Sequence, residues 1–99
     1  MIINARASET SDLYMNVIAR PLSNLRIAVC RNGIQWLVQV RDGASRGVPR
    51  WRVCAYVMTR PGLIKALRRF GGLSERDATD VVDALPSRPQ APEKAYSPK

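Results

Sequence analysis

The sequence predicts an α+β domain, in which a three-stranded antiparallel meander is followed by two helices packed on one face. Three observations predict this β-β-β-α-α order. An Asn-Gly pair separates two alternating apolar runs, a third alternating run follows, and two amphipathic segments with helix-capping residues complete the domain.

The first two strands are expected to meet at Asn32-Gly33, a dipeptide typical of tight β-hairpin turns. A two-residue turn there gives these pairs: Arg31 with Ile34, Val29 with Trp36, Ile27 with Val38 and Leu25 with Val40. One face then carries the apolar residues Leu25, Ile27, Val29, Ile34, Trp36, Val38 and Val40. The other carries Arg26, Ala28, Cys30, Gln35, Leu37, Gln39 and Arg41. A slip of one residue would spoil the apolar face, so the turn and the alternation support the same register.

The segments on either side of this hairpin are interpreted from the same patterns. Residues 51–58 alternate and predict a third strand, with Trp51, Val53, Ala55 and Val57 on the apolar face. Residues 42–50 are rich in Gly, Ser and Pro and predict a loop. Residues 13–21 fit both strand alternation and helical spacing, and we favour a short helix or an irregular segment.

Two helices are predicted after the third strand. Thr59 is a suitable N-cap, Pro61 suits a first turn, and Gly71-Gly72 ends the helix. Its apolar stripe is Leu63, Ile64, Leu67 and Phe70. Ser74 begins a second helix with the stripe Ala78, Val81, Val82 and Leu85, which Pro86 ends. We expect both helices to cover the Trp36/Trp51 face, with a core of Trp36, Trp51, Val38, Leu67, Phe70 and Val82.

The rest of the chain is expected to add no second domain. Residues 1–12 are predicted to be a flexible N-terminus, residues 13–86 a single α+β domain, and residues 87–99 a disordered, proline-rich tail. No apolar run approaches the roughly 18 residues of a membrane span, and no signal peptide is evident, so we expect a cytoplasmic protein. Cys30 and Cys54 would lie on outer strands, roughly 9.5 Å apart at the usual strand spacing, and are expected to stay unlinked.

Charge is the most informative property of the composition. The net charge is +8, and eleven basic residues but only one acid, Asp42, lie between Arg20 and Arg69. Residues 74–86 reverse the sign, with four acids against Arg76. Such segregation concentrates polyanions at the positive region.

Catalysis is not expected, because the sequence has no histidine, no glycine-rich phosphate loop and no metal-binding motif. We therefore predict neither an enzyme nor a metal site, a cofactor or a small-molecule substrate.

Two surfaces are candidates for binding. The second face of the sheet combines hydrogen-bond donors with one aromatic side chain, in Arg26, Arg41, Arg52, Gln35, Gln39 and Tyr56, and could read base edges. A basic crescent is predicted from the 42–50 loop and the first helix, comprising Arg46, Arg50, Arg60, Lys65, Arg68 and Arg69. A helix-turn-helix is disfavoured, because its recognition helix would be the acidic one.

The segment Asn32 to Gly71, with Asn-Gly-Ile-Gln-Trp-Leu-Val-Gln, Trp51-Arg52, Tyr56 and Thr59-Arg60-Pro61-Gly62-Leu63, resembles small uncharacterised proteins of bacterial mobile elements and phages. The strand order is also similar to sheet-reading DNA-binding domains of the AP2 and integrase-arm type, from which the tight first hairpin and the acidic helix depart. The resemblance implies a DNA-binding accessory factor that acts on DNA, RNA or a nucleoprotein complex. The alternative it leaves open is an anti-CRISPR-type inhibitor that binds a host effector complex by protein contact.

Overall fold

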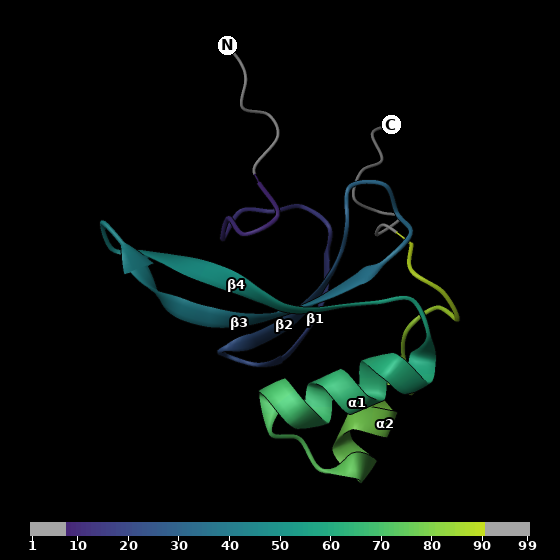
Figure 1. Ribbon diagram of the computed structural model, residues 1–99. Coiled ribbons are helices and arrows are strands. Elements are labelled where there is room, and N and C mark those ends of the chain that lie inside the picture. Colours follow the sequence, from purple (N-terminus) through teal and green to yellow (C-terminus); the bar gives the residue numbers. More distant parts are fainter. Residues whose placement is uncertain (1–7, 91–99) are drawn as a thin grey trace.

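The computed structural model describes residues 8–90 as a four-stranded antiparallel sheet with two helices on one of its faces (Figure 1). Along the chain the elements are β1 (Val17–Leu22), β2 (Leu25–Val29), β3 (Trp36–Ser45), β4 (Val48–Val57), α1 (Arg60–Gly71) and α2 (Glu75–Asp83). The strands lie in the order β1-β2-β3-β4. The α+β class and the antiparallel meander are confirmed, but the sheet has one strand more than the three expected.

The register of the β2–β3 hairpin is the predicted one. The pairs include Val29 with Trp36, Ile27 with Val38 and Leu25 with Val40. The turn, however, is wider than two residues, because the Cys30 N–H donates to the Gln35 carbonyl at 3.0 Å. Gly33 takes a φ of 74° and its N–H donates to the Cys30 carbonyl. Arg31 and Ile34 therefore belong to the loop instead of forming the innermost pair, and Ile34 is 58% exposed.

β1 corrects the expectation of a helix or irregular segment over residues 13–21. Val17 pairs with Ala28 and Ala19 with Ile27, with irregularities in the register. The strand alternation of this segment prevails because β2 offers an open edge to pair with, which the local spacing does not reveal. Pro21 is tolerated at the edge of the sheet, where its missing N–H costs no ladder bond.

The prediction of a loop over residues 42–50 was also wrong, because this segment forms the outer half of a long hairpin. Ala44 pairs with Pro49 and Ser45 with Val48, and the chain reverses at the two residues between them. Those residues, Arg46 and Gly47, have φ values of 54° and 80°. Positive φ at both positions is the geometry of a two-residue turn that matches the twist of the strands.

A β-bulge in β4 reverses the direction of Trp51. Val38 pairs with Ala55, but the next residue of β3, Gln39, pairs with Val53, so Cys54 is an extra residue. One extra residue moves every side chain beyond it to the opposite face. Trp51 and Val53 therefore lie on the face away from the helices, and their predicted place beside Trp36 was wrong.

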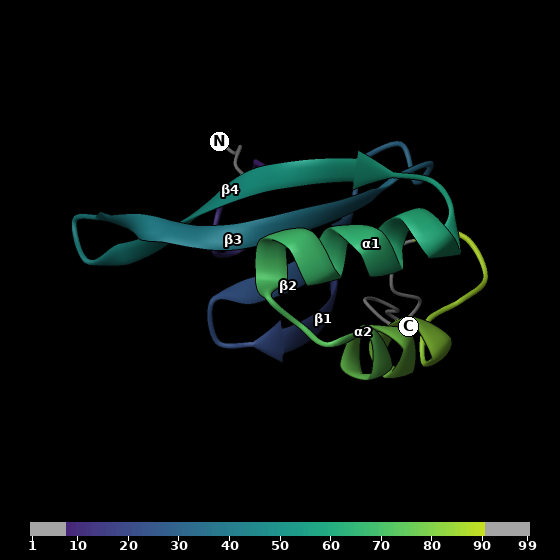
Figure 2. The same ribbon diagram turned by 60° about the horizontal axis from the view of Figure 1, so that its bottom comes forward.

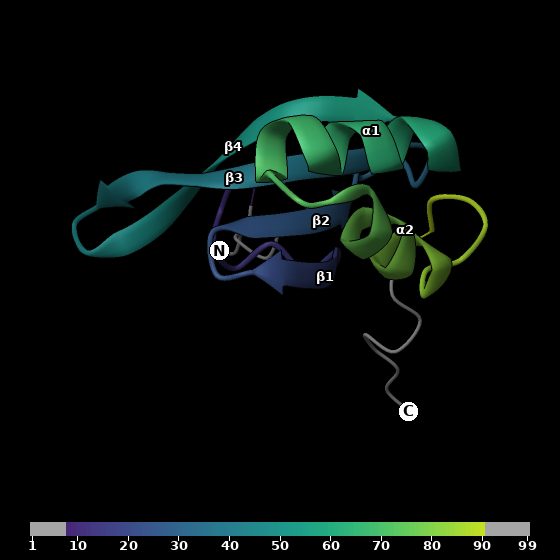
Figure 3. The same cartoon turned by 90° about the horizontal axis from the view of Figure 1, so that it is seen from below.

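Both helices begin at the predicted capping residues and α1 ends at the predicted Gly72, but α2 ends at Asp83, before the predicted Pro86. The Thr59 Oγ1 accepts the Gly62 N–H at 3.1 Å, and the Ser74 Oγ accepts the Asp77 N–H at 3.0 Å. Gly72 ends α1 with a φ of 72°, a left-handed conformation that glycine adopts without strain. Figures 2 and 3 show α1 beneath β3 and β4, with α2 beside it on the β1 side.

The main core lies between the sheet and the helices. Its buried members are Leu25, Ile27, Val29, Trp36, Val38, Leu63, Ala66, Leu67, Ala78 and Val82. The expected core residues Trp36, Val38, Trp51, Leu67 and Val82 are all buried, although Trp51 is buried on the other face. The prediction of Phe70 as a core residue was wrong, since its side chain is 40% exposed. In the last turn of α1 it is Gly71 that faces Leu25.

Residues 8–14, which we call the N-terminal strap, lie on the face of the sheet turned away from the helices (Figure 1). The Tyr14 hydroxyl donates to the Val29 carbonyl at 2.6 Å, and the Trp51 N–H donates to the Thr10 carbonyl at 3.3 Å. Residues 8–12 of the expected flexible N-terminus thus pack against the sheet, whereas residues 1–7 lie outside the described part. Of the expected 87–99 tail, Pro89 is buried and residues 91–99 lie outside it.

Two further expectations concern the cysteines and the membrane. Cys30 and Cys54 are both free thiols. Cys30 lies just past the end of β2, an inner strand between β1 and β3, so its expected place on an outer strand was wrong. Over residues 8–90 neither helix is long and apolar enough to span a bilayer.

Candidate nucleic-acid interface

The second face of the sheet holds a buried polar cluster where an open binding surface was expected. Arg26 and Gln39 are both 0% exposed. The Arg26 Nε donates to the Gln39 Oε1 at 2.5 Å, and its Nη2 donates to the carbonyls of Ser11 at 2.8 Å and Glu9 at 3.2 Å. The Gln39 Nε2 also donates to the Glu9 carbonyl, at 2.7 Å. These groups hold the strap in place, so Arg26 and Gln39 were wrongly assigned to an interface.

The aromatic ring of Trp51 closes this cluster. The Arg26 guanidinium lies 4.4 Å from the ring centroid, a cation–π distance, and the Trp51 Nε1 donates to the Asp12 Oδ1 at 3.0 Å. Burial, and to a smaller extent the nearby charge of Arg20, lowers the pKa of Arg26 to about 10, so the group remains charged at neutral pH. The Arg26 charge is therefore part of the fold.

The rest of the predicted sheet surface is partly accessible. Tyr56 is 58% exposed, and Arg41 and Arg52 are also exposed. The Arg52 Nε lies 3.5 Å from the Asp42 Oδ2, so much of its charge is locally compensated. Tyr56 and Arg52 line a shallow groove of about 440 Å³ along β4, together with Arg50 and Trp51. Gln35 is half-buried in the β2–β3 turn.

Arg60 was also expected in the basic crescent, but it joins the two helices. Its Nη2 donates to the Val82 carbonyl at 3.2 Å and lies 3.1 Å from the Asp83 Oδ1. Its Nη1 reaches the Leu85 carbonyl at 3.5 Å. A cation at the carbonyl end of α2 stabilises that helix end, so Arg60 has a structural role.

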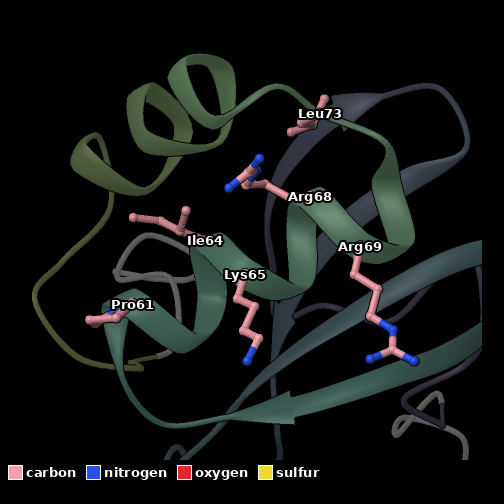
Figure 4. Close-up of a pocket in the computed structure, with 6 residues that line it drawn as sticks. All are labelled: Pro61, Ile64, Lys65, Arg68, Arg69 and Leu73. Carbon is pink, nitrogen blue, oxygen red and sulfur yellow. The ribbon is translucent and has the colours of Figure 1, made fainter.

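The remaining cations of α1 surround a groove of about 490 Å³. Its lining residues are Pro61, Ile64, Lys65, Arg68, Arg69 and Leu73. In Figure 4, Lys65 and Arg69 point to the side of α1 that lies next to the sheet, whereas Arg68 points toward α2. Arg68 lies 3.9 Å from Glu75, a long and exposed pair. Within residues 8–90, Lys65 and Arg69 have no carboxylate partner.

The other cations of the crescent lie on the β3–β4 hairpin, whose tip extends past the C-terminal end of α1 (Figures 2 and 3). Arg46 forms the tip and Arg50 lies on β4, and both are exposed. The predicted crescent is therefore two basic surfaces instead of one. The first is the outer hairpin with Arg41, Arg46 and Arg50, and the second is the exposed surface of α1 with Lys65, Arg68 and Arg69.

The described residues offer few groups for metal binding or redox chemistry. Across residues 8–90, no three His, Cys, Asp or Glu side chains gather as a metal site would need. Cys30 is 8% exposed, and its pKa is lowered, because backbone N–H groups of the β2–β3 turn outweigh the raising effect of burial.

Sequence reasoning missed the strap, because its contacts use backbone carbonyls at Glu9 and Ser11 that carry no compositional signal. A weak signal was present in the apolar residues Leu37 and Ala28 on the supposed wet face, which needed a cover. No protein-family model matches this chain, and neither a curated protein nor a solved structure does.

Proposed function

We propose that this chain is a non-enzymatic nucleic-acid-binding protein whose two basic surfaces contact the phosphate backbone. The observation that carries this proposal is the segregation of unpaired charge. Arg46 and Arg50 on the hairpin and Lys65 and Arg69 on α1 are exposed without a carboxylate partner within residues 8–90. Phosphate contact by such side chains supplies most of the affinity in sequence-independent binding.

The acids of the chain support the same assignment. Asp42 and Asp83 are each paired with an arginine, and Asp12 accepts from Trp51. Within residues 8–90, the acids without such a partner are Asp77 and Asp80, and both lie on α2. A polyanion would thus approach the hairpin and α1 and be repelled from α2.

Salt dependence of binding tests the proposal. Anisotropy of a fluorescein-labelled 20-base-pair duplex should report binding that weakens by on the order of a hundredfold between 50 and 200 mM salt, as four or five phosphate contacts require. Replacing both Lys65 and Arg69 by Glu should weaken binding and flatten the salt slope. The matched control is Arg76→Glu/Arg88→Glu, which changes the net charge by the same amount. Both residues are exposed and lie outside the two basic surfaces.

Two outcomes count against nucleic-acid binding. The first is the absence of any anisotropy change at 50 mM salt with duplex or single-stranded DNA or RNA. The second is equal weakening by the control and the α1 variant, which would mean that net charge alone, without a defined surface, drives association.

A second candidate is inhibition of a nucleic-acid-processing complex by protein contact, of the anti-CRISPR type. The observation in its favour is the α1 groove, where the apolar residues Ile64, Pro61 and Leu73 adjoin the cations. Such a mixed surface suits an acidic amphipathic segment. Under this function, a stoichiometric complex with an effector would form without free nucleic acid, and Ile64→Asp would disrupt it.

A further inference from the structure

The outer part of the β3–β4 hairpin, residues 41–51, forms a two-stranded ribbon that projects beyond the helices (Figures 2 and 3). From the Arg41–Trp51 pair to the turn, each strand adds about five residues, or roughly 15 Å at the usual rise. Except for Trp51 at its base and Pro49, the ribbon's described side chains are exposed, including Val48 at 52%. Beyond the Ser11–Arg50 bridge, which joins the strap to β4 at the base, the ribbon presents both of its edges and faces to a partner.

The tip of the ribbon departs from what stability alone would select. Arg46 takes a φ of 54°, and within residues 8–90 it is the one non-glycine residue with a positive φ. Asn or Gly suits that position best, and a longer side chain there costs on the order of 1 kcal/mol. Backbone strain that persists at an exposed residue indicates that the side chain has a role in binding. A guanidinium at the end of a 15 Å ribbon would be the first group to meet a partner.

The charge of the ribbon is strongly positive. Arg41, Arg46 and Arg50 are exposed, and Asp42, its one acid, lies 3.5 Å from Arg52. Within residues 8–90 no other carboxylate pairs with these three arginines. The chemistry of the ribbon thus fits an anion-lined channel about as wide as two strands.

We propose that the β3–β4 ribbon enters the major groove of duplex DNA, a proposal that rests on the nucleic-acid-binding function. The major groove of B-DNA is about 12 Å wide and admits a two-stranded ribbon, whereas the minor groove is only about 6 Å wide. The major groove of duplex RNA is deep and narrow and excludes it. Arg46 at the tip faces the base edges, where arginine binds guanine O6 and N7, and Arg41 and Arg50 contact the flanking phosphates.

Variants at the ribbon test whether it carries binding. Arg46→Gly removes the charge and relieves the strained φ, so we expect the melting temperature to hold or rise while affinity for duplex DNA falls about tenfold. Reversing both Arg46 and Arg50 to Glu should cost more and lower the salt slope by about two. The control is again the Arg76→Glu/Arg88→Glu variant. Parental affinity in folded Arg46→Gly and in the double reversal would overturn the proposal.

Dimethyl sulfate footprinting identifies the groove, because it methylates guanine N7 in the major groove and adenine N3 in the minor groove. At saturation on a 14-base-pair duplex, we expect protection of guanine N7 and unchanged adenine N3, and binding at least about tenfold weaker to the same sequence as duplex RNA. Protection of adenine N3 alone, or of neither base, would overturn the ribbon proposal while leaving nucleic-acid binding intact. No binding to any nucleic acid would overturn both the nucleic-acid-binding function and the ribbon proposal. The ribbon would then be expected to bind a protein partner.

Discussion

The buried Arg26–Gln39 pair is the sharpest place to test the fold. Arg26→Met keeps an apolar side chain of similar length but removes three donated hydrogen bonds, one to Gln39 and two to strap carbonyls. The Glu9 carbonyl keeps its bond from Gln39 and the Ser11 carbonyl keeps its bond from the Tyr14 N–H, so the acceptor left without a donor is the Gln39 Oε1. Ser11 is only half-buried and water can reach it, but Gln39 is fully buried.

The magnitude follows from two opposing terms. A hydrogen bond to a charged group is worth about 1.5–3 kcal/mol, and three of them are lost. Removing the charge also removes the unfavourable environment, chiefly burial, that lowers the pKa of Arg26 to about 10, and this relief is worth roughly 3 kcal/mol. The lost bonds outweigh this relief, and we expect the free energy of unfolding to fall by about 2–4 kcal/mol. Gln39→Leu should cost a similar amount, because it leaves the Arg26 Nε without an acceptor.

The double variant Arg26→Met/Gln39→Leu should be more stable than either single variant, within about 1 kcal/mol of the parent, because no buried polar group remains unpaired between the two positions. Urea unfolding followed by tryptophan fluorescence measures all four proteins, and we expect a coupling energy of at least about 2 kcal/mol. In the double variant the strap loses the hydrogen bonds that Arg26 and Gln39 donate to it. Hydrogen exchange of the Trp51 backbone amide, which is bonded to the Thr10 carbonyl, should therefore accelerate. Additive effects of the two substitutions would refute the reasoning.

The pH dependence of the same variants has a definite sign. Above about pH 10 the unfolded chain would keep the Arg26 proton that the folded chain has lost, so this group makes stability rise with pH only there, until the unfolded chain loses the proton as well. From about pH 6 to pH 9 Arg26 is charged in both states. The difference in unfolding free energy between the parent and Arg26→Met should therefore stay constant over that range, and a slope would show that another group senses the cluster.

Three further predictions concern single positions. Trp36→Ala should lower the free energy of unfolding, measured in urea, by about 3–5 kcal/mol. Trp36→Phe should lower it much less, because the ring still fills most of the space and the indole N–H that is lost has no partner within residues 8–90. Gly71→Ala should lower the melting temperature despite alanine's better helix propensity, since its Cβ would collide with the buried Leu25 side chain; a higher melting temperature would contradict this. Arg60→Met should destabilise by about 1–2 kcal/mol through the lost bonds to the Val82 and Leu85 carbonyls, with its effect on duplex affinity no larger than that of the Arg76→Glu/Arg88→Glu control.

The elements that could be predicted from the sequence are those whose determinants are local. The β2–β3 register follows from a turn and an alternation that agree. The starts of both helices and the end of α1 follow from Thr59, Ser74 and Gly72, each of which bonds or bends within its own neighbourhood. Local chemistry also explains the error at residues 42–50. Glycine-rich composition marks a reversal of the chain, but it does not distinguish a loop from a hairpin tip.

The candidate site was predicted less well, because burial of a charged side chain depends on distant segments. Arg26 and Gln39 have the residue types of a base-reading surface, and the strap that covers them lies 15 to 30 positions away in sequence. Arg60 belongs to a basic run, yet its partners are carbonyls at the end of the next helix. Composition identified the cations correctly, but only the tertiary structure separates those that hold the fold together from those left exposed.

The bulge at Cys54 links these observations. Without that extra residue, Trp51 would stay on the helix-covered face, and Arg26 would lose the ring on which it lies. Because Trp51 turns to the opposite face, its indole can donate to the strap at Asp12, and the strap can close over the polar cluster. The middle of the sheet is thereby withdrawn from solvent on both faces. The cations of the predicted basic crescent that remain accessible lie on the projecting ribbon and on α1, so binding of a polyanion would take place at the edges of this fold, away from its flat sheet surface.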